Sequence, residues 1–186
     1  SVVISHFHPD LINVIRLKDG TAQFPNAEIR VPEAEWAFWM DDAKMAAAPD
    51  GMKPVFQNAR RVFGPVAKDV KMFSDGKEAA AGVIAAATPG HTPGHCSFVV
   101  QSGAGKLMVM SDLTNHPALF VRNPDWQAVF DMDGEKAKAV RRKMLEMAAS
   151  EKAQVAFYHA PFPATGQIAK DGEGYRLAPA QWSSAL

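Results

Sequence analysis

The chain has 186 residues, 47% of them apolar, which is enough for the core of one domain over residues 1–186. Its 20 basic and 20 acidic side chains cancel to a net charge of zero, so the composition gives no reason to expect a nucleic-acid partner. The apolar runs are too short to span a bilayer, and we expect no membrane partner. The single cysteine, Cys96, excludes an intrachain disulfide and a zinc site built from cysteines.

Strands and helices alternate along the predicted chain. Short runs rich in β-branched residues predict strands, at residues 2–5, 27–31, 70–73, 82–87, 97–101, 106–111 and 155–158. The predicted helices cover residues 32–48, 52–63 and 134–152. The first helix opens at Pro32, and the last follows a candidate N-cap at Asp133. This alternation predicts an α/β or α+β fold.

The densest chemical signal is the segment His6-Phe7-His8-Pro9-Asp10, directly after the first predicted strand. Alternate residues of an extended segment point the same way, so His6, His8 and Asp10 would share one face. Pro9 disfavours a helix at His8 and favours that extended path. Imidazoles and carboxylates are ligands that zinc accepts, although two loop histidines beside a turn aspartate would give the same pattern.

Three later polar residues also follow predicted strands, where loops on a rigid scaffold commonly carry sites. His91 stands in Thr88-Pro-Gly-His-Thr-Pro-Gly-His95, between two Pro-Gly turns. Asp112 ends the predicted hairpin, and His159 follows the last predicted strand. Each has an ordinary structural explanation when taken alone: a rigid turn, a turn-forming aspartate and a satisfied histidine. We interpret His95 as a surface polar residue.

The order His-x-His-x-Asp, Thr-Pro-Gly-His, Ser-Asp and a final His resembles the metallo-β-lactamase superfamily. Within it, the chain is similar to methyl parathion hydrolase and lactonase-like members. Further matching segments are Phe24-Pro25-Asn26-Ala27, Phe38-Trp39, Phe162-Pro163 and Gly174-Tyr175-Arg176, so the resemblance extends to about residue 183. It implies a four-layer αββα sandwich, of which this chain would hold only the C-terminal part.

The resemblance also implies a ligand set for one or two zinc ions. The implied metal ligands are His6, His8 and His91 for the first ion, Asp10 and His159 for the second, and Asp112 between the two. Hydroxide held by the metal would attack an ester, lactone or phosphotriester, since zinc lowers the pKa of bound water towards about 7. Asp10 would also act in catalysis, by orienting the nucleophile or carrying a proton.

The sequence departs from the family pattern at two positions of the first motif. Leu11 stands where the family has a ligand histidine, which weakens the second zinc site. Val14 stands where the family has a glycine, and its side chain would crowd a turn. The resemblance implies that an N-terminal half is absent, which would leave a sheet face bare. We expect a homo-oligomer or a further segment to cover that face. The localisation stays open between the cytoplasm and the periplasm of a bacterium.

Aromatic residues gather in the helical region after the first motif, and most of them are expected in the core. Trp39 resembles a pocket-lining aromatic residue of the methyl parathion hydrolase group. His116 and Phe120 follow Asp112 closely, so all three are candidates for substrate binding, with structural roles as the alternative. An apolar pocket beside a metal suits a small hydrophobic ester, lactone or organophosphate.

Other functions remain as alternatives. A catalytically impaired or engineered fragment with one metal or none would act as a folding or assembly module, which Leu11 and Val14 favour. A di-iron oxygen reductase carries a carboxylate where this chain has His8, so this alternative ranks low. A thioesterase of the glyoxalase II kind has a similar ligand set and stays open.

Overall fold

The computed structural model describes residues 1–182 and divides the strands between two sheets. The smaller sheet is parallel, in the order β1 (Val2–Val3), β2 (Ile29–Pro32) and β3 (Lys71–Phe73). The larger sheet has the order β10-β9-β8-β7-β6-β5-β4 and is antiparallel except between β7 and β8. Its strands are β4 (Glu78–Ala80), β5 (Val83–Ala87), β6 (Cys96–Ser102), β7 (Gly105–Val109), β8 (Gln154–Ala156), β9 (Thr165–Asp171) and β10 (Gly174–Pro179).

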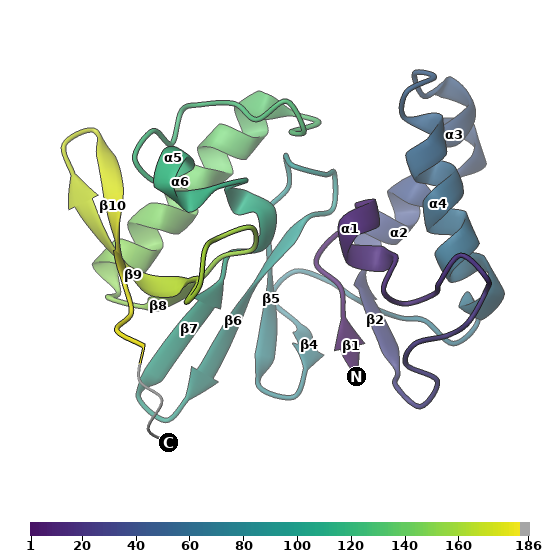
Figure 1. The fold of residues 1–186 in the computed structure, drawn as a ribbon, viewed down its shortest axis with the longest axis horizontal. Helices are drawn as coiled ribbons and strands as arrows, with labels where there is room; N and C mark the ends of the chain where they lie inside the picture. Colours follow the sequence, from purple (N-terminus) through teal and green to yellow (C-terminus); the bar gives the residue numbers. More distant parts are fainter. Residues whose placement is uncertain (183–186) are drawn as a thin grey trace.

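Helices lie on both outer sides of the molecule, with the two sheets between them (Figure 1). The helices after β2 are α2 (Glu33–Trp39), α3 (Asp42–Ala47) and α4 (Lys53–Phe63), and α6 (Gly134–Ser150) lies against the larger sheet. The short elements are α1 (Pro9–Ile12), η1 (Gly64–Val66), η2 (Ser111–Leu113) and α5 (Pro117–Phe120). This arrangement confirms the mixed α/β (α+β) class. Within the described residues, no helix combines the length and apolar character needed to cross a membrane.

Amphipathic spacing explains the two longest helices. On α4, Phe56, Ala59 and Phe63 recur at helical spacing and are buried in the core cluster over the smaller sheet. Helix α6 begins where predicted, because the side chain of Asp133 accepts a hydrogen bond from the Lys136 amide. Its buried face includes Met144, which joins the core cluster of the larger sheet. Each sheet therefore has a core cluster beside its helices, and a third cluster combines residues of both sheets.

The structure differs from the predicted elements at several places. The helix predicted over residues 32–48 is two helices, because the side chain of Asp41 accepts from the Lys44 amide and caps a new start. The segment after His8 is not extended, since Pro9 occupies the first helical position of α1. The sequence analysis also missed β4, α5, β9 and β10. Val14 is half-exposed and has no positive φ, so the turn accommodates its side chain.

The buried carboxylate of Glu35 connects the two sheets. It accepts hydrogen bonds from the Phe7 amide after β1 (2.8 Å), from the Gly94 amide before β6 (2.7 Å) and from the Trp39 indole (2.8 Å). Burial raises the pKa of Glu35, although the hydrogen-bond donors around its carboxylate lower it. A Cβ on Gly94 would lie 2.2 Å from the Glu35 amide nitrogen, so only glycine lets this loop rest on α2.

We predict that Glu35→Ala lowers the free energy of unfolding by about 3 kcal/mol or more, because it leaves three buried N–H donors without an acceptor. Glu35→Gln keeps one carbonyl oxygen and should lose less. Urea unfolding of both variants measures the effect. Glu33→Ala, on the exposed side of the same helix, is the control and should change stability by at most about 1 kcal/mol. Equal losses in Glu35→Ala and Glu33→Ala would contradict the prediction.

Candidate metal centre

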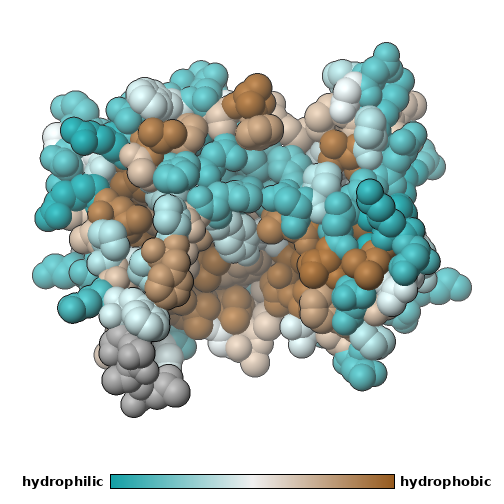
Figure 2. All heavy atoms as spheres, in the orientation of Figure 1, coloured by the Kyte–Doolittle hydropathy of each residue, from teal (hydrophilic) through white to brown (hydrophobic). Residues whose placement is uncertain are grey.

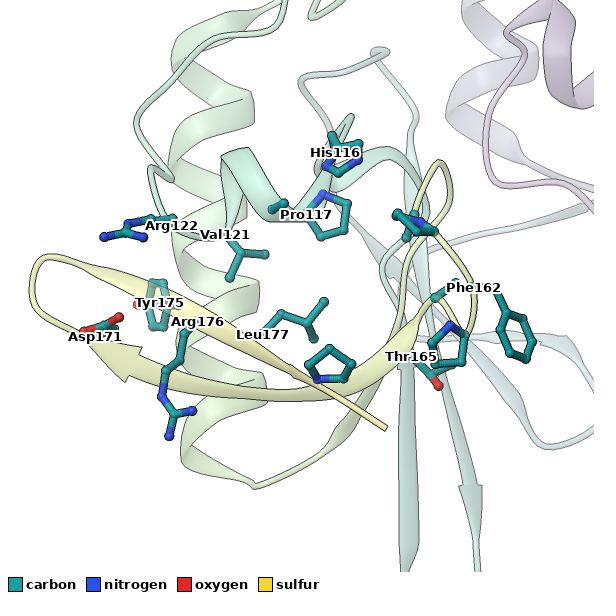
Figure 3. A pocket seen from close by; sticks show the side chains of 16 residues that line it. His116, Pro117, Val121, Arg122, Phe162, Thr165, Asp171, Tyr175, Arg176 and Leu177 are labelled. Atoms are coloured by element: carbon teal, nitrogen blue, oxygen red, sulfur yellow. The ribbon is translucent and has the colours of Figure 1, made fainter. Parts of the chain in front are cut away.

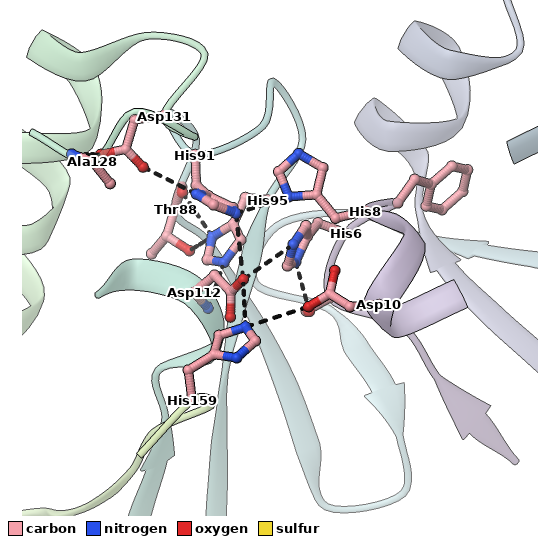
Figure 4. A network of polar contacts seen from close by, with 12 residues as sticks. His6, His8, Asp10, Thr88, His91, His95, Asp112, Ala128, Asp131 and His159 are labelled. Carbon is pink, nitrogen blue, oxygen red and sulfur yellow. Dashed lines mark hydrogen bonds and ion pairs between the residues drawn. The ribbon is translucent and has the colours of Figure 1, made fainter. Parts of the chain in front are cut away.

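The polar residues singled out in the sequence come together where several strands end (Figure 4). His6 and His8 follow β1, and His91 follows β5. Asp112 lies in η2 after β7, and His159 follows β8. The short distances between these side chains show that the strand ends of both sheets meet at one place.

Four of these residues form a first group of possible metal ligands: His6, His8, His91 and Asp112. One ligand atom from each lies within 4.8 Å of the others. The Oδ2 atom of Asp112 is 3.5 Å from His6 Nε2 and 3.3 Å from His91 Nε2. His8 Nδ1 is 3.0 Å from His91 Nε2. The ligand atoms thus point at a common centre.

Two buried atoms of this group lack a hydrogen bond, which tests whether a cation fits. His6 Nε2 and Asp112 Oδ1 have no hydrogen-bond partner among residues 1–182. A buried polar atom without a partner costs about 1–3 kcal/mol, and coordination of a cation removes that cost. Three imidazoles and a carboxylate are a ligand set that suits zinc. The residues present therefore fit a divalent ion.

Asp10, Asp112 and His159 form a second and more open group. His159 Nε2 lies 3.4 Å from Asp10 Oδ2 and 3.3 Å from Asp112 Oδ2. Asp112 belongs to both groups, but the side chains of His159 and Asp10 are 43% and 52% exposed. Leu11 packs against the core cluster of the smaller sheet and supplies no further ligand. The second group is poorer in ligands and closer to solvent than the first.

Burial and neighbouring charges separate the histidines electrostatically. Desolvation lowers the pKa of His6 well below its usual value and that of His8 to about 4, so both imidazoles are neutral ligands at pH 7. Burial also lowers the pKa of His91, but hydrogen bonds to Asp112 and Asp131 outweigh it and raise this pKa to about 9. A cation held by His91 Nε2 would replace the proton that faces Asp112, whereas Nδ1 would keep its proton and donate to Asp131.

His95 supports the Asp112 loop from inside the protein. It is fully buried, which corrects its interpretation as a surface residue. His95 Nε2 accepts a hydrogen bond from the Asp112 amide (3.1 Å), so Nδ1 carries the proton and donates to the Thr88 carbonyl oxygen (2.9 Å). Burial lowers the pKa of His95 to about 3, which keeps this neutral form. The second histidine of the Thr-Pro-Gly-His repeat therefore positions a ligand.

Two non-glycine residues of the centre have left-handed backbone conformations. Ser111, directly before Asp112, has φ 53°, and His159 has φ 54°. Such conformations cost about 1–3 kcal/mol and persist only where surrounding contacts impose them. Both lie where a strand of the larger sheet passes into a loop, so they turn Asp112 and His159 towards the centre.

A cavity of about 790 Å³ opens beside both ligand groups. Its walls combine ligand residues with apolar side chains, among them Met52, Val55, Val129 and Phe130. Val129 is 89% exposed and Phe130 is 64% exposed. Figure 2 shows apolar side chains gathered over the loop between α5 and α6, which carries these residues. The mouth of the cavity is therefore apolar and its floor is polar.

The three candidate substrate contacts lie at different depths. His116 lines the cavity. Trp39 is fully buried and donates its indole N–H to Glu35. Phe120 is 8% exposed and lies under the guanidinium of Arg141, 4.9 Å from its ring centre. Of the three, only His116 is among the described residues that line this cavity. Trp39 and Phe120 are buried instead.

His116 also lines a second cavity, of about 370 Å³, between α5 and the β9–β10 hairpin (Figure 3). Apolar side chains such as Val121, Phe162 and Leu177 form much of its wall. No metal-ligand residue of either group is among those that line it in the described chain. Among the described residues, His116 is the one that lines both cavities.

The sequence analysis missed four polar residues that support the centre: Glu35, His95, Asp131 and Arg141. Arg141 could have been recognised from the sequence, because its spacing places it on the same helix face as Ala137, Met144 and Ala148. A charged residue on an apolar helix face predicts a buried ion pair. Asp131 lies in a loop without regular spacing, and nothing in the sequence distinguishes it from an ordinary turn former.

Solved structures show where this fold occurs. The hydrolase AbOPH of the beta-lactamase superfamily is 26% identical with a TM-score of 0.90, and the match covers 98% of this chain and 64% of that one. AidC, a dizinc quorum-quenching lactonase in complex with the product N-hexanoyl-L-homoserine, is 27% identical with a TM-score of 0.89 and the same coverage. A probable metal-dependent hydrolase from Staphylococcus aureus, 22% identical, shares the fold with a TM-score of 0.77 over 97% of this chain and 63% of that one.

The chain spans 64% of the length of the first two of these structures. Among curated proteins, none matches this chain. The family model of the metallo-beta-lactamase superfamily matches residues 1–159, which contain both ligand groups. The fold, with two sheets between helices, and the candidate metal ligands at the strand ends are consistent with this match. The chain belongs to the metallo-β-lactamase superfamily.

Proposed function

We propose that this protein is a zinc-dependent hydrolase that cleaves a small ester or lactone with an apolar chain. One observation carries the proposal: His6, His8, His91 and Asp112 direct their ligand atoms to one point at the floor of an apolar cavity. Zinc, when bound, would lower the pKa of a water molecule towards about 7 and polarise the scissile carbonyl. The residues of the chain supply the positions and the surroundings for that chemistry.

Asp10 is the proposed proton-handling residue. Its carboxylate lines the cavity, is half-exposed and lies 3.4 Å from His159, so it reaches both solvent and the centre. At this place it can orient a nucleophile and pass a proton to solvent. His116, on the same cavity wall, is the proposed polar contact to the substrate. No side chain of the protein needs to act as a nucleophile.

The apolar mouth supports a substrate with a hydrophobic chain. Val129 and Phe130 are large, exposed and directly beside the polar floor. An ester or lactone head at the floor would place its chain against these side chains. AidC, which is similar over 98% of this chain, was solved with the product N-hexanoyl-L-homoserine, a head group with an apolar acyl chain. An organophosphate triester is the second candidate, because its phosphoryl centre accepts the same nucleophile.

A protein with one metal or none is the alternative function. Leu11 favours it, because the second group has no fourth ligand on α1. Metal analysis of protein purified without chelators separates the cases: about one ion per chain supports a single working group, and none supports an assembly module. A molar mass measured in solution on the same sample tests the expected homo-oligomer.

We predict that His91→Ala abolishes zinc-dependent hydrolysis, because this variant removes a ligand that lies 3.3 Å from Asp112. Hydrolysis of an acyl lactone, an aryl ester and a phosphotriester should be measured after chelation and after zinc is added back. The wild-type protein should regain activity on at least one substrate. His91→Ala with full activity after zinc is added back would contradict the assignment.

We predict that Leu11→His raises the bound zinc from about one to about two ions per chain, because it adds an imidazole beside Asp10 on α1. Equilibrium dialysis followed by metal analysis measures this. Leu17→His is the matched control, since Leu17 is 42% exposed and belongs to neither ligand group. Equal stoichiometry in both variants would mean that position 11 does not limit the second site.

We predict that Phe130→Ala raises KM for a long-chain substrate by about tenfold and leaves a short-chain substrate with the same head group unchanged. The lost aromatic contact is worth about 1–2 kcal/mol. Phe162→Ala is the control, because Phe162 is 74% exposed and lines the second cavity instead. If chain length made no difference to the effect of Phe130→Ala, the loop would not contact the substrate chain.

A further inference from the structure

Behind His91, Asp131 and Arg141 form a buried ion pair outside both ligand groups. Asp131 Oδ1 is 3.0 Å from His91 Nδ1, and Asp131 Oδ2 is 3.2 Å from Arg141 Nη2. The two charged side chains are only 2% and 1% exposed. Burial of two charges is expensive unless they are paired and hydrogen-bonded, so this pair is a built feature of the interior.

The carboxylate of Asp131 determines which nitrogen of His91 faces the centre. It accepts a hydrogen bond at Nδ1, which leaves Nε2 directed at Asp112 Oδ2 (3.3 Å) and at His8 Nδ1 (3.0 Å). The second oxygen of Asp131 accepts from the Ala128 amide as well as from Arg141. An imidazole held in this way has a fixed ring orientation and a fixed ligand atom.

Arg141 connects this contact to the loop of Asp112. Its Nε donates to the carbonyl oxygen of Leu113, the residue after Asp112 (2.7 Å), and its Nη1 donates to the carbonyl oxygen of Trp126 (2.6 Å). The same guanidinium lies over the ring of Phe120, 4.9 Å from its centre. One cation on α6 therefore holds both the segment that carries Asp112 and the loop that carries Asp131.

Main-chain contacts fix the distance between His91 and Asp131. The Met132 amide donates to the His91 carbonyl oxygen (3.2 Å), and the Asp133 amide donates to that of Gly90 (2.9 Å). Gly90 has φ 138°, and a Cβ there would lie 2.4 Å from the Ala137 amide nitrogen. The turn of His91 therefore rests directly on the first turn of α6, and Asp131 has little freedom to move away.

We propose that Asp131, held by Arg141, is a positioning residue that sets the affinity of the first ligand group for zinc. Asp131 reaches the cavity wall, but both of its oxygens are held by His91, Ala128 and Arg141. The pair therefore acts through the orientation of His91 and the placement of the Asp112 loop. This inference rests on the proposed function in one respect, that the first group binds a divalent cation.

Asp131→Asn is the main test. The amide has one oxygen, so its NH2 group must face either the His91 Nδ1–H or the donors of Arg141 and Ala128. We expect the dissociation constant for zinc, measured by competition with a chromophoric chelator, to rise about 10–100-fold. The visible spectrum of the cobalt-substituted protein should change as well, because it reports the ligand geometry and needs no turnover.

Asp125→Asn is the matched control. Asp125 lies in the same loop and pairs with Arg142, the next residue of α6, with Oδ1 2.6 Å from Nε. That pair is exposed, at 61% for Asp125 and 38% for Arg142, so its loss should leave zinc affinity unchanged within about twofold.

A further variant separates positioning from folding. Asp131→Glu keeps the charge beside Arg141 but moves the carboxylate by one methylene, and we expect a loss of zinc affinity between those of Asp125→Asn and Asp131→Asn. Urea unfolding of the metal-free proteins shows whether each variant is folded when zinc is added. If Asp131→Asn does not fold, Asp131→Glu decides, and wild-type zinc affinity in that variant overturns the proposal.

The outcomes for this inference and for the proposed function are distinct. If the wild-type chain binds zinc and Asp131→Asn binds it as tightly as Asp125→Asn, the positioning role is wrong and the hydrolase proposal stands. If the wild-type chain binds no zinc, both are wrong.

Discussion

The candidate ligands of the metal centre follow strands of both sheets, and the buried carboxylate of Glu35 connects these sheets. The geometry of the centre therefore depends on Glu35. Glu35 accepts the amide of Phe7, between the first two ligand histidines, and the amide of Gly94, directly before His95. Glu35 lies in the first turn of α2, so the loop of His6 and His8 and the loop of His91 are both hydrogen-bonded to the same helix. Fold stability and site geometry are therefore coupled: a change that separates the sheets also separates the ligands. The metal centre therefore lies where strand ends of both sheets meet.

Hydrogen bonding differs between the candidate ligands, which form the inner layer of the centre, and the residues that support them, which form its outer layer. In the outer layer, His95, Asp131 and Arg141 are all partnered by main-chain or charged groups. In the inner layer, His6 Nε2 and Asp112 Oδ1 have no hydrogen-bond partner among the described residues. Native proteins seldom leave buried polar atoms in this state unless an ion or water completes them. The contrast fits a centre in which the protein orients the ligands and a cation satisfies them.

The sequence predicted candidate ligands that lie close together in the structure, because most of them follow strands whose ends meet at one place. It also located α4 and α6, whose apolar spacing is regular. Two local features were not predicted: the break between α2 and α3 and the helical start at Pro9. Each depends on a single residue at a helix start, whereas the prediction followed the residue pattern of a longer segment. Glu35 and Asp131 could not be predicted, because a buried carboxylate is recognised by partners far along the chain. Arg141 is the exception, because a charged residue on the apolar face of α6 indicates a buried acidic partner.

The two ligand groups share Asp112, and this links their occupancy. Asp112 Oδ2 lies 3.3 Å from both His91 and His159, so a cation in the first group draws on the same carboxylate that the second group needs. His91 is 3% exposed and held by Asp131, whereas His159 is 43% exposed, and Leu11 contributes its side chain to the core instead of to the metal. We therefore expect stepwise binding, with a tight ion in the first group and a weaker one in the second. If the second group held its ion weakly, the Asp10 carboxylate at the cavity edge would be available for the role proposed for it.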